Sequence, residues 1–196
     1  GYPTVWGTAA LRAAIRGYAE SRWHAVALRD DQVLPVVGTK ELVAALPLQL
    51  GIGAGDTVVI PATAYPTYEV GALIAGATVL ATDDPAEAAA ASPALIWINS
   101  PANPHGAILS PDALRAWVDA ARSTGAVLAS DECYGEFGWE AEPVSVLDPA
   151  INGGSLEGLI AAFSLSKRSN LAGYRAGFLV GDAPLIGELL AVRKHA

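Results

Sequence analysis

The chain has 196 residues, of which 52% are hydrophobic and 16% charged, so it has enough apolar material for a sizeable core and is not expected to be disordered. Its formal net charge of −8 argues against a nucleic-acid partner, because phosphate backbones are bound by clustered Lys and Arg. The single cysteine, Cys133, excludes an internal disulfide framework, and no run approaches the roughly 20 apolar residues of a bilayer span. With no signal peptide either, we expect a cytoplasmic protein without a membrane partner.

Short apolar runs rich in β-branched residues predict seven strands. They cover residues 33–37, 57–60, 78–80, 95–98, 126–129, 159–163 and 176–180. Segments with helical spacing cover residues 8–23, 41–50, 68–75, 111–123 and 184 onward. Because the strands are continuously apolar and alternate with helices, we expect a three-layer α/β/α fold with a mostly parallel, seven-stranded sheet.

The remaining segments give weaker signals. Ser110 before Pro111 is typical of a helix start, and Gly125 is typical of a helix end. Residues 83–92 are either a linker or a short surface helix. Residues 138–158 are rich in Gly, Pro and Asn, which predicts a loop.

The first candidate site is a phosphate-binding turn. Gly38, Thr39 and Lys40 lie between a strand and a helix, where the free N–H groups and the dipole of the helix attract anions. Gly38 permits close approach of the backbone. A plain capping box, formed by Thr39 and a nearby acid, explains the same residues equally well.

The loops after strands 57–60 and 95–98 carry aromatic and amide side chains. Tyr65 and Tyr68 follow strand 57–60, and such a ring either stacks on a flat heterocycle or packs in the core. Asn103 lies in a segment, residues 99–106, whose Pro and Gly content predicts a tight turn. Ligands of parallel sheets bind at the carboxyl ends of strands, so these loops are plausible walls of one site.

A carboxylate ends the strand 126–129. Asp131 there suits a pyridinium nitrogen, because an ionised aspartate keeps that nitrogen protonated and the ring electron-deficient. Tyr134, three residues on, can donate a hydrogen bond to the phenolic oxygen of such a ring. Alternatively, Asp131 and Glu132 form a metal site or an acid/base pair. We disfavour this alternative because adjacent strand residues point to opposite faces.

The segment after strand 159–163 carries a lysine and an arginine eight positions apart. A lysine that forms an imine with an aldehyde cofactor needs a phosphate site beside it, which hydroxyls and a guanidinium supply. Lys167, the hydroxyls of Ser164 and Ser166, and Arg175 fit this requirement. Taken alone, a Ser-x-Ser-Lys sequence is more typical of a solvated loop with surface charges, so the assignment depends on the other motifs.

Taken in order, these motifs resemble the class I/II aminotransferases, which are fold type I enzymes of pyridoxal phosphate (PLP). The motifs are Gly38-Thr39-Lys40, Tyr65, Asn103-Pro104-x-Gly106, Asp131-x-x-Tyr134 and Ser164-x-Ser166-Lys167 with Arg175. They span nearly the whole chain, and an ordered set is far more specific than any single motif. The resemblance implies PLP as cofactor, an amino donor and a 2-oxo acid as small-molecule partners, and no metal.

The resemblance also implies a role for each residue. Lys167 forms the Schiff base with PLP and moves the proton between Cα of the substrate and C4′ of the cofactor. Asp131 pairs with the pyridine nitrogen, Asn103 and Tyr134 bind O3′, and Tyr65 stacks on the ring. The phosphate is held at the turn after Gly38 by Thr39, Lys40, Ser164, Ser166 and Arg175. Tyr2 is the candidate for a tyrosine that reaches the phosphate of the neighbouring subunit, which implies a homodimer.

Within the family, several phrases look most like the actinobacterial N-succinyldiaminopimelate aminotransferases of lysine and diaminopimelate synthesis. These phrases are residues 36–42, 64–68, 130–134 and 171–177. One departure from the family is His105, which stands where Thr is usual in the Asn-Pro-Thr-Gly turn. That change can alter packing near the substrate without removing Asn103.

The helical pattern at residues 189–196 has no Gly or Asn stop signal, so we expect a fragment of a longer protein. Residues 1–196 then form an incomplete PLP-binding large domain. We expect the amino-terminal arm to be missing, together with the small carboxyl-terminal domain that in this family carries the arginine for the α-carboxylate of the substrate. The fragment alone is expected to show little turnover.

Two other functions remain open. C–S lyases, decarboxylases and aminotransferases of other amino acids use the same lysine and aspartate on this scaffold. A PLP-responsive transcription regulator has a sensory domain that binds the cofactor without turnover, and such proteins carry a basic DNA-binding segment upstream.

Overall fold

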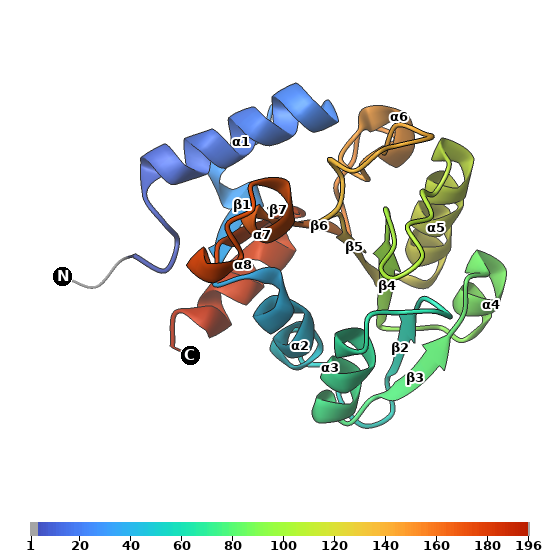
Figure 1. Ribbon diagram of the computed structural model, residues 1–196. Helices are drawn as coiled ribbons and strands as arrows, with labels where there is room; N and C mark the ends of the chain where they lie inside the picture. Colours follow the sequence, from blue (N-terminus) through green and yellow to red (C-terminus); the bar gives the residue numbers. More distant parts are fainter. Residues whose placement is uncertain (1–3, 196) are drawn as a thin grey trace.

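Seven apolar segments form a single mixed sheet in the computed structural model (Figure 1). The structure describes residues 4–195. The strands are β1 Val33–Val36, β2 Thr57–Ile60, β3 Thr78–Ala81, β4 Leu95–Asn99, β5 Val127–Asp131, β6 Leu159–Ser164 and β7 Gly177–Gly181. Their order across the sheet is β1-β7-β6-β5-β4-β2-β3. Strand β7 runs antiparallel to β1 and β6, and the other neighbours are parallel, which confirms the expected mostly parallel, seven-stranded sheet.

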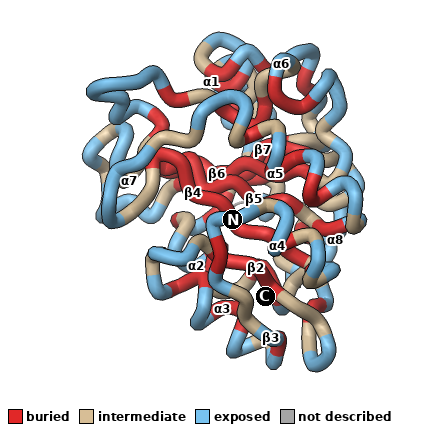
Figure 2. The backbone as a smooth tube through the Cα atoms, turned by 90° about the vertical axis from the view of Figure 1, so that its right-hand side faces the viewer, coloured by how far each residue is buried: buried red, intermediate tan, exposed pale blue. Residues whose placement is uncertain are grey.

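Helices cover both faces of this sheet. They are α1 Ala9–Trp23, α2 Thr39–Gln49, α3 Thr67–Ala75, α4 Pro85–Ala90, α5 Pro111–Thr124, α6 Pro149–Asn152, α7 Leu165–Arg168 and α8 Ala183–Arg193, with short 3-10 turns η1 Asp30–Gln32 and η2 Ala172–Tyr174. Buried residues of α1, α4, α5 and α6 share one apolar cluster, and those of α2, α3 and α8 share the other. Figure 2 shows the buried strands running between these two exposed layers. The three-layer α/β/α prediction is therefore confirmed.

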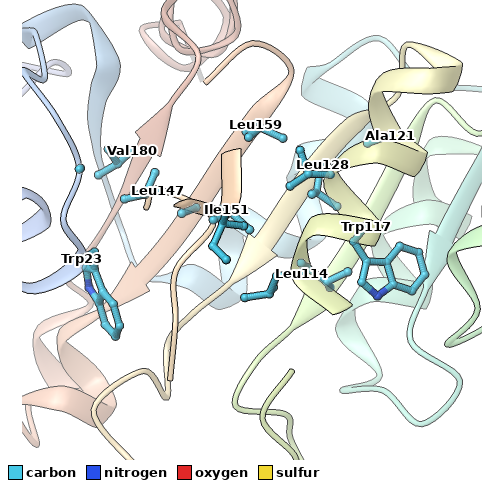
Figure 3. Packing of buried hydrophobic residues seen from close by; sticks show 14 of the residues in the cluster. Trp23, Leu114, Trp117, Ala121, Leu128, Leu147, Ile151, Leu159 and Val180 are labelled. Atoms are coloured by element: carbon cyan, nitrogen blue, oxygen red, sulfur yellow. The ribbon is translucent and has the colours of Figure 1, made fainter. Parts of the chain in front are cut away.

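The first apolar cluster contains large side chains from elements far apart in the sequence. Trp23 of α1 and Trp117 of α5 lie on the same face of the sheet as Leu128 and Leu159, which are fully buried (Figure 3). Each fully buried leucine contributes about 1.5–3 kcal/mol to folding. This packing holds the carboxyl ends of β5 and β6 in fixed positions, which matters because those ends carry Asp131 and Ser164.

Helix ends follow the sequence signals at most positions. The side chain of Ser110 accepts a hydrogen bond from the Ala113 N–H, and Gly125 ends α5 with a left-handed backbone, as predicted. Residues 85–90 form the short helix α4 rather than a linker. The prediction of a loop over residues 138–158 is wrong for α6. Asp148 caps this single turn through the Ala150 N–H, and the Gly, Pro and Asn content of the region hid it.

The antiparallel direction of β7 decides where the connecting segment lies. Because β6 and β7 run in opposite directions, residues 165–176 leave and re-enter the sheet at the same end of its strands. The Leu165 N–H donates to the Ala176 carbonyl at 3.1 Å and closes this segment at its base. The carboxyl ends of β4 and β5 lie at that same end of the sheet. Within residues 4–195, no helix is long and apolar enough to span a bilayer.

Candidate active site

A cavity of about 230 Å³ lies at the carboxyl ends of β4, β5 and β6. Its lining residues are Thr39, Lys40, Val43, Tyr65, Tyr68, Asn99, Asn103, Asp131, Cys133, Tyr134, Ser164, Ser166, Lys167, Ala172 and Arg175. Every residue predicted to bind cofactor is among them except Gly38, which lies behind Arg175, and Tyr2, which is outside the described residues. The fold thus brings motifs from across the chain into one place.

Asp131 lies at the end of β5 with both carboxylate oxygens bonded. The Tyr68 hydroxyl donates to Oδ2 at 2.7 Å, and the Cys133 N–H donates to Oδ1 at 3.1 Å. Only 8% of Asp131 is exposed. Burial and the neighbouring Asp131 charge raise the pKa of Tyr68 well above its usual value, so this hydroxyl stays a donor. The two donors fix the direction in which the carboxylate faces the cavity.

Asn99 links the end of β5, which carries Asp131, to the turn after β4, which carries Asn103. Its Nδ2 donates to the Asp131 carbonyl at 2.8 Å and to the Pro101 carbonyl at 3.2 Å. Its Oδ1 accepts from the Asn103 N–H at 2.7 Å. Asn99 is buried, so these bonds replace its hydration. The turn that holds Asn103 is therefore tied to the backbone of β5.

The same turn tolerates His105. Gly106 takes a positive φ of 74°, and its N–H donates to the Ala102 carbonyl at 2.7 Å. The His105 ring is exposed, and its Nδ1 accepts from the Ala107 N–H at 3.3 Å. The departure from the family pattern leaves the turn intact, and Asn103 still lines the cavity.

An anion site is formed where α2 begins. Gly38 is the N-cap residue, with φ 86° and ψ 149°, and has no side chain to bond the first N–H groups of the helix. Those groups and the helix dipole remain available to an anion. The capping-box alternative for Thr39 is not observed, because its Oγ1 accepts from the Cys133 thiol at 3.3 Å. Arg175 lies directly against Gly38 and adds a guanidinium.

Lys167 enters the cavity from α7, the single turn that follows β6. Ser164 caps this turn by accepting from the Ser166 N–H at 3.1 Å. The Lys167 ammonium lies 5.5 Å from the centre of the Tyr134 ring. Aromatic faces attract cations at this distance, so the ring and the ammonium face each other across the cavity.

The charges of the cavity favour an anionic ligand. Lys40, Lys167 and Arg175 line it against one carboxylate, that of Asp131, which leaves two positive charges in excess. In residues 4–195 none of the three cations forms an ion pair with a carboxylate. The whole chain carries −8, so this excess is local to the cavity.

Glu132 does not share the site with Asp131. It points into the opposite layer, where its Oε1 accepts from the Ser130 hydroxyl at 2.9 Å and from the Val146 N–H at 3.0 Å. Burial raises the pKa of Glu132 to about 7. Among the described residues there is no group of three His, Cys, Asp or Glu side chains that could hold a metal ion.

Sequence reasoning missed several residues of the cavity. Asn99 received no role, and Tyr68 was interpreted only as a stacking or core-packing ring, because their partners come from other strands. Cys133 and Val43 carry no chemical signal in sequence, and Ala172 lies in η2, whose position depends on the antiparallel β7. Of these residues, only Tyr68 had a signal in the sequence that could have placed it in the cavity, because an aromatic residue in a loop after a strand is a plausible wall of a ligand site.

The residues present fit the chemistry of PLP. A phosphate dianion matches the uncapped start of α2 with Arg175 and Lys40 beside it. A protonated pyridine nitrogen matches a buried carboxylate such as Asp131, and an aldehyde matches the amine of Lys167. Donors for a phenolic oxygen are present in the side chains of Asn103 and Tyr134.

Curated relatives share this sequence over its whole length. The chain is 53% identical over 196 residues to a probable aminotransferase of Mycobacterium tuberculosis, and covers 47% of that protein. It is 54% identical over 196 residues to the 4-dedimethylamino-4-oxo-anhydrotetracycline transaminase OxyQ of Streptomyces rimosus, and covers 54% of it. Over 207 residues, or 99% of the chain, it is 31% identical to the LL-diaminopimelate aminotransferase of Aquifex aeolicus, of which it covers 52%. The chain thus spans about half the length of the curated relatives it matches.

A solved structure shares the fold. The aminotransferase AspB of Helicobacter pylori superposes with a TM-score of 0.90 at 29% identity, covering 100% of this chain and 55% of that one. The family model "Aminotransferase class I and II" matches residues 1–196. The chain therefore belongs to the class I and II aminotransferases, whose cofactor is pyridoxal phosphate.

Proposed function

We propose that the full-length protein containing this chain transfers an amino group from an amino acid to a 2-oxo acid. By full-length protein we mean the natural product of the gene that encodes these residues. The observation that carries the proposal is the meeting of Lys167 and Asp131 in one cavity that has an excess of positive charge. These are the two side chains that PLP chemistry at an amino-acid Cα requires.

Each proposed role is the one that the family resemblance implies, and the position of the residue in the cavity supports it. Lys167 binds the aldehyde carbon and afterwards moves a proton to and from Cα of the substrate. Asp131, oriented by Tyr68 and Cys133, holds a proton on the ring nitrogen. When bound, PLP supplies the aldehyde and an electron-poor ring that accepts the Cα electron pair.

The other predicted residues bind and orient the cofactor in this proposal. Asn103 and Tyr134 bind O3′, and Tyr65 lies against the ring. The phosphate is held by the backbone after Gly38 and by Thr39, Lys40, Ser164, Ser166 and Arg175. Tyr2 reaches the phosphate site of a second subunit, so the working unit is a homodimer with shared sites. A cytoplasmic location is part of the proposal, supported by the single cysteine.

We propose N-succinyl-LL-2,6-diaminopimelate and 2-oxoglutarate as products, formed from glutamate and N-succinyl-2-amino-6-ketopimelate. Support comes from the phrases at residues 36–42, 64–68, 130–134 and 171–177, and from the 31% identical relative named for LL-diaminopimelate. The enzyme then works in lysine and diaminopimelate synthesis. The 54% identical OxyQ supports a second candidate, a ketone on a bulky polycyclic acceptor, with the same residues doing the chemistry.

We also propose that residues 1–196 are an incomplete PLP-binding large domain. The curated relatives are about twice as long, which supports a division of the substrate site between this chain and other residues of the full-length protein. The chain alone is expected to bind cofactor and to show little turnover. Full steady-state activity of residues 1–196 would contradict this part of the proposal.

The test is an absorption spectrum of the full-length protein with PLP, recorded before and after adding each amino donor separately. Loss of the visible band with both glutamate and N-succinyl-LL-diaminopimelate, reversed by 2-oxoglutarate, supports transamination and this substrate together. Loss with glutamate alone keeps transamination and rejects the diaminopimelate substrate. The polycyclic acceptor is tested by its ability to restore the band.

Variants identify the lysine in the same experiment. Lys167→Ala should abolish the band and the covalent label left by borohydride, whereas Lys194→Ala, at the exposed end of α8, should retain both. If Lys167 is labelled but no amino group is transferred, the products identify the reaction. Pyruvate and ammonia would favour a lyase, and carbon dioxide would favour a decarboxylase. A labelled protein with no turnover of any amino acid would favour the regulator alternative.

A further inference from the structure

A second polar cluster lies behind the cavity, around Glu136. Its Oε1 accepts from the Tyr18 hydroxyl at 2.9 Å and from Arg168 Nε at 3.1 Å, and its Oε2 accepts from Arg22 Nε at 3.0 Å. Tyr18 and Arg22 belong to α1, and Arg168 is the last residue of α7. One carboxylate therefore joins the loop after β5 to two helices.

The contacts around Glu136 reinforce one another. The Arg168 guanidinium lies 4.4 Å from the centre of the Tyr18 ring, so the same tyrosine contacts both members of the ion pair. Partial burial raises the pKa of Glu136, but hydrogen bonds from Arg22, Tyr18 and Arg168 outweigh it and hold the pKa below the usual value. The carboxylate is therefore ionised at neutral pH.

Helix α7 needs an anchor of this kind. It is a single turn of four residues with no buried side chain, and one isolated turn has little stability of its own. Its backbone is held at the start by the Ser164 cap and by the Leu165 bond to Ala176. At its end, the Arg168 side chain contacts Glu136 and Tyr18, which belong to other elements.

The Arg168–Glu136 contact lies next to the contact between Lys167 and Tyr134. Lys167 faces the Tyr134 ring at 5.5 Å, and the next residue of the helix, Arg168, bonds to Glu136, two residues after Tyr134. The loop after β5 and helix α7 are thus joined at two adjacent points. One point faces the cavity, and the other faces α1. A movement of α7 along the loop would break both contacts.

We propose that Glu136 is a positioning residue which, through Arg168, sets the distance of Lys167 from Tyr134 and neutralises the charge next to that lysine. The inference rests on the proposed roles of Lys167 and Tyr134, and goes beyond them by assigning the Tyr18–Arg22–Glu136–Arg168 cluster to the amino-transfer reaction. Glu136 does not touch the cavity, so its effect is indirect.

The experiment compares Glu136→Gln with a matched control in the full-length protein. Glu142→Gln removes a carboxylate outside this cluster, one that pairs with Arg22 at 2.8 Å. Glu136→Gln should lower kcat roughly tenfold with little change in KM, because a lysine displaced by a fraction of an ångström transfers protons slowly. Glu142→Gln should keep the wild-type kcat.

A spectroscopic readout separates positioning from simple stabilisation of the fold. In Glu136→Gln the Arg168 charge is no longer neutralised, so it disfavours a second positive charge on the neighbouring Lys167. The pH midpoint of the visible band of the bound cofactor should therefore move to lower pH. A general loosening of α1 would lower thermal stability and leave this midpoint in place.

Arg168→Gln provides the second variant, at a side chain that is 40% exposed and so is compatible with folding. If Glu136 acts through Arg168, then Glu136→Gln should have no further effect on kcat in the Arg168→Gln background. An undiminished effect there, or an unchanged kcat and midpoint in Glu136→Gln, would overturn the inference. Wild-type protein with no borohydride label on Lys167 would instead overturn the proposed function on which it rests.

Discussion

The Tyr68 hydroxyl donates a hydrogen bond of 2.7 Å to Asp131 Oδ2, joining the first turn of α3 to the end of β5. The pair is buried and also contacts Trp97, whose ring centre is 5.1 Å from that of Tyr68. The orientation of the carboxylate in the cavity therefore depends on a residue of the helix that follows β2, two strands away from β5 in the sheet.

Tyr68→Phe should reduce both kcat and cofactor affinity by roughly tenfold, because a bond to a charged acceptor contributes about 1.5–3 kcal/mol and its loss frees the Asp131 side chain to turn. The measurement is steady-state kinetics with PLP titration in the full-length protein. Tyr174→Phe is the control, since this tyrosine is 78% exposed. Equal losses in both variants would show that the hydroxyl of Tyr68 has no special role.

Gly38→Ala should weaken cofactor binding through Arg175. An added Cβ would lie 2.8 Å from Arg175 Cζ, so the guanidinium must leave the start of α2. The φ of +86° adds backbone strain of about 1–3 kcal/mol. Gly55→Ala is the matched control, with φ +98° and no atom within 4 Å. Both variants should lose thermal stability, and only Gly38→Ala should lose PLP affinity, by tenfold or more, in a fluorescence titration.

Asn99→Asp should impair the site, because a carboxylate oxygen would then face the Asp131 and Pro101 carbonyls where an amide donor stood. A buried group left without its bonds costs about 1–3 kcal/mol. Asn152→Asp is the control: Asn152 is equally buried and bonds Val146 and Gly154, away from the cavity. We expect both to lower the melting temperature and only Asn99→Asp to shift the visible spectrum of the bound cofactor. A spectral shift with Asn152→Asp would argue against a local effect.

Glu132 should make stability depend on pH. Burial raises its pKa from 4.5 to about 7, and its Oε2 has no hydrogen-bond partner within residues 4–195. Between these two values the folded state keeps a proton that the unfolded chain has lost. The stabilisation is therefore complete below about pH 4.5 and is lost as the pH rises through 7, an effect of roughly 3 kcal/mol.

Glu132→Gln removes this titration and should flatten the fall in melting temperature between pH 5 and about pH 8. The measurement is a series of thermal melts of the full-length protein with a fixed PLP concentration, because ligand binding also shifts the melting temperature. Parallel pH curves for wild type and variant would show that Glu132 does not titrate in this range.

Most strands were predictable because apolar β-branched runs are buried on both faces of such a sheet. Residues 57–60 form β2 as predicted. Strand β5 extends two residues beyond its apolar run, because Ser130 and Asp131 continue the ladder with β4 although they are polar. The antiparallel direction of β7 has no signature in periodicity, since direction depends on pairing partners rather than on the residues of the strand.

The site was predictable to the extent that its residues belong to ordered motifs. Asp131 ends β5, and Asn103 and Lys167 follow the ends of β4 and β6, where ligand sites gather. The structure places all three on one cavity. The bonds of Asn99 and Tyr68 depend on which strands become neighbours. The partners of Glu136 come from α1 and α7, more than 100 residues apart in sequence. Sequence spacing contains no information on such contacts.

The segment between β6 and β7 leaves and rejoins the sheet at adjacent positions, with the Leu165–Ala176 hydrogen bond across its base. Lys167 and Arg175 therefore both lie on one segment whose two ends meet at the sheet. Because the segment is closed at its base, a displacement of it relative to the sheet moves both side chains together. The distance of the amine from Asp131 and the position of the guanidinium at the start of α2 therefore change together.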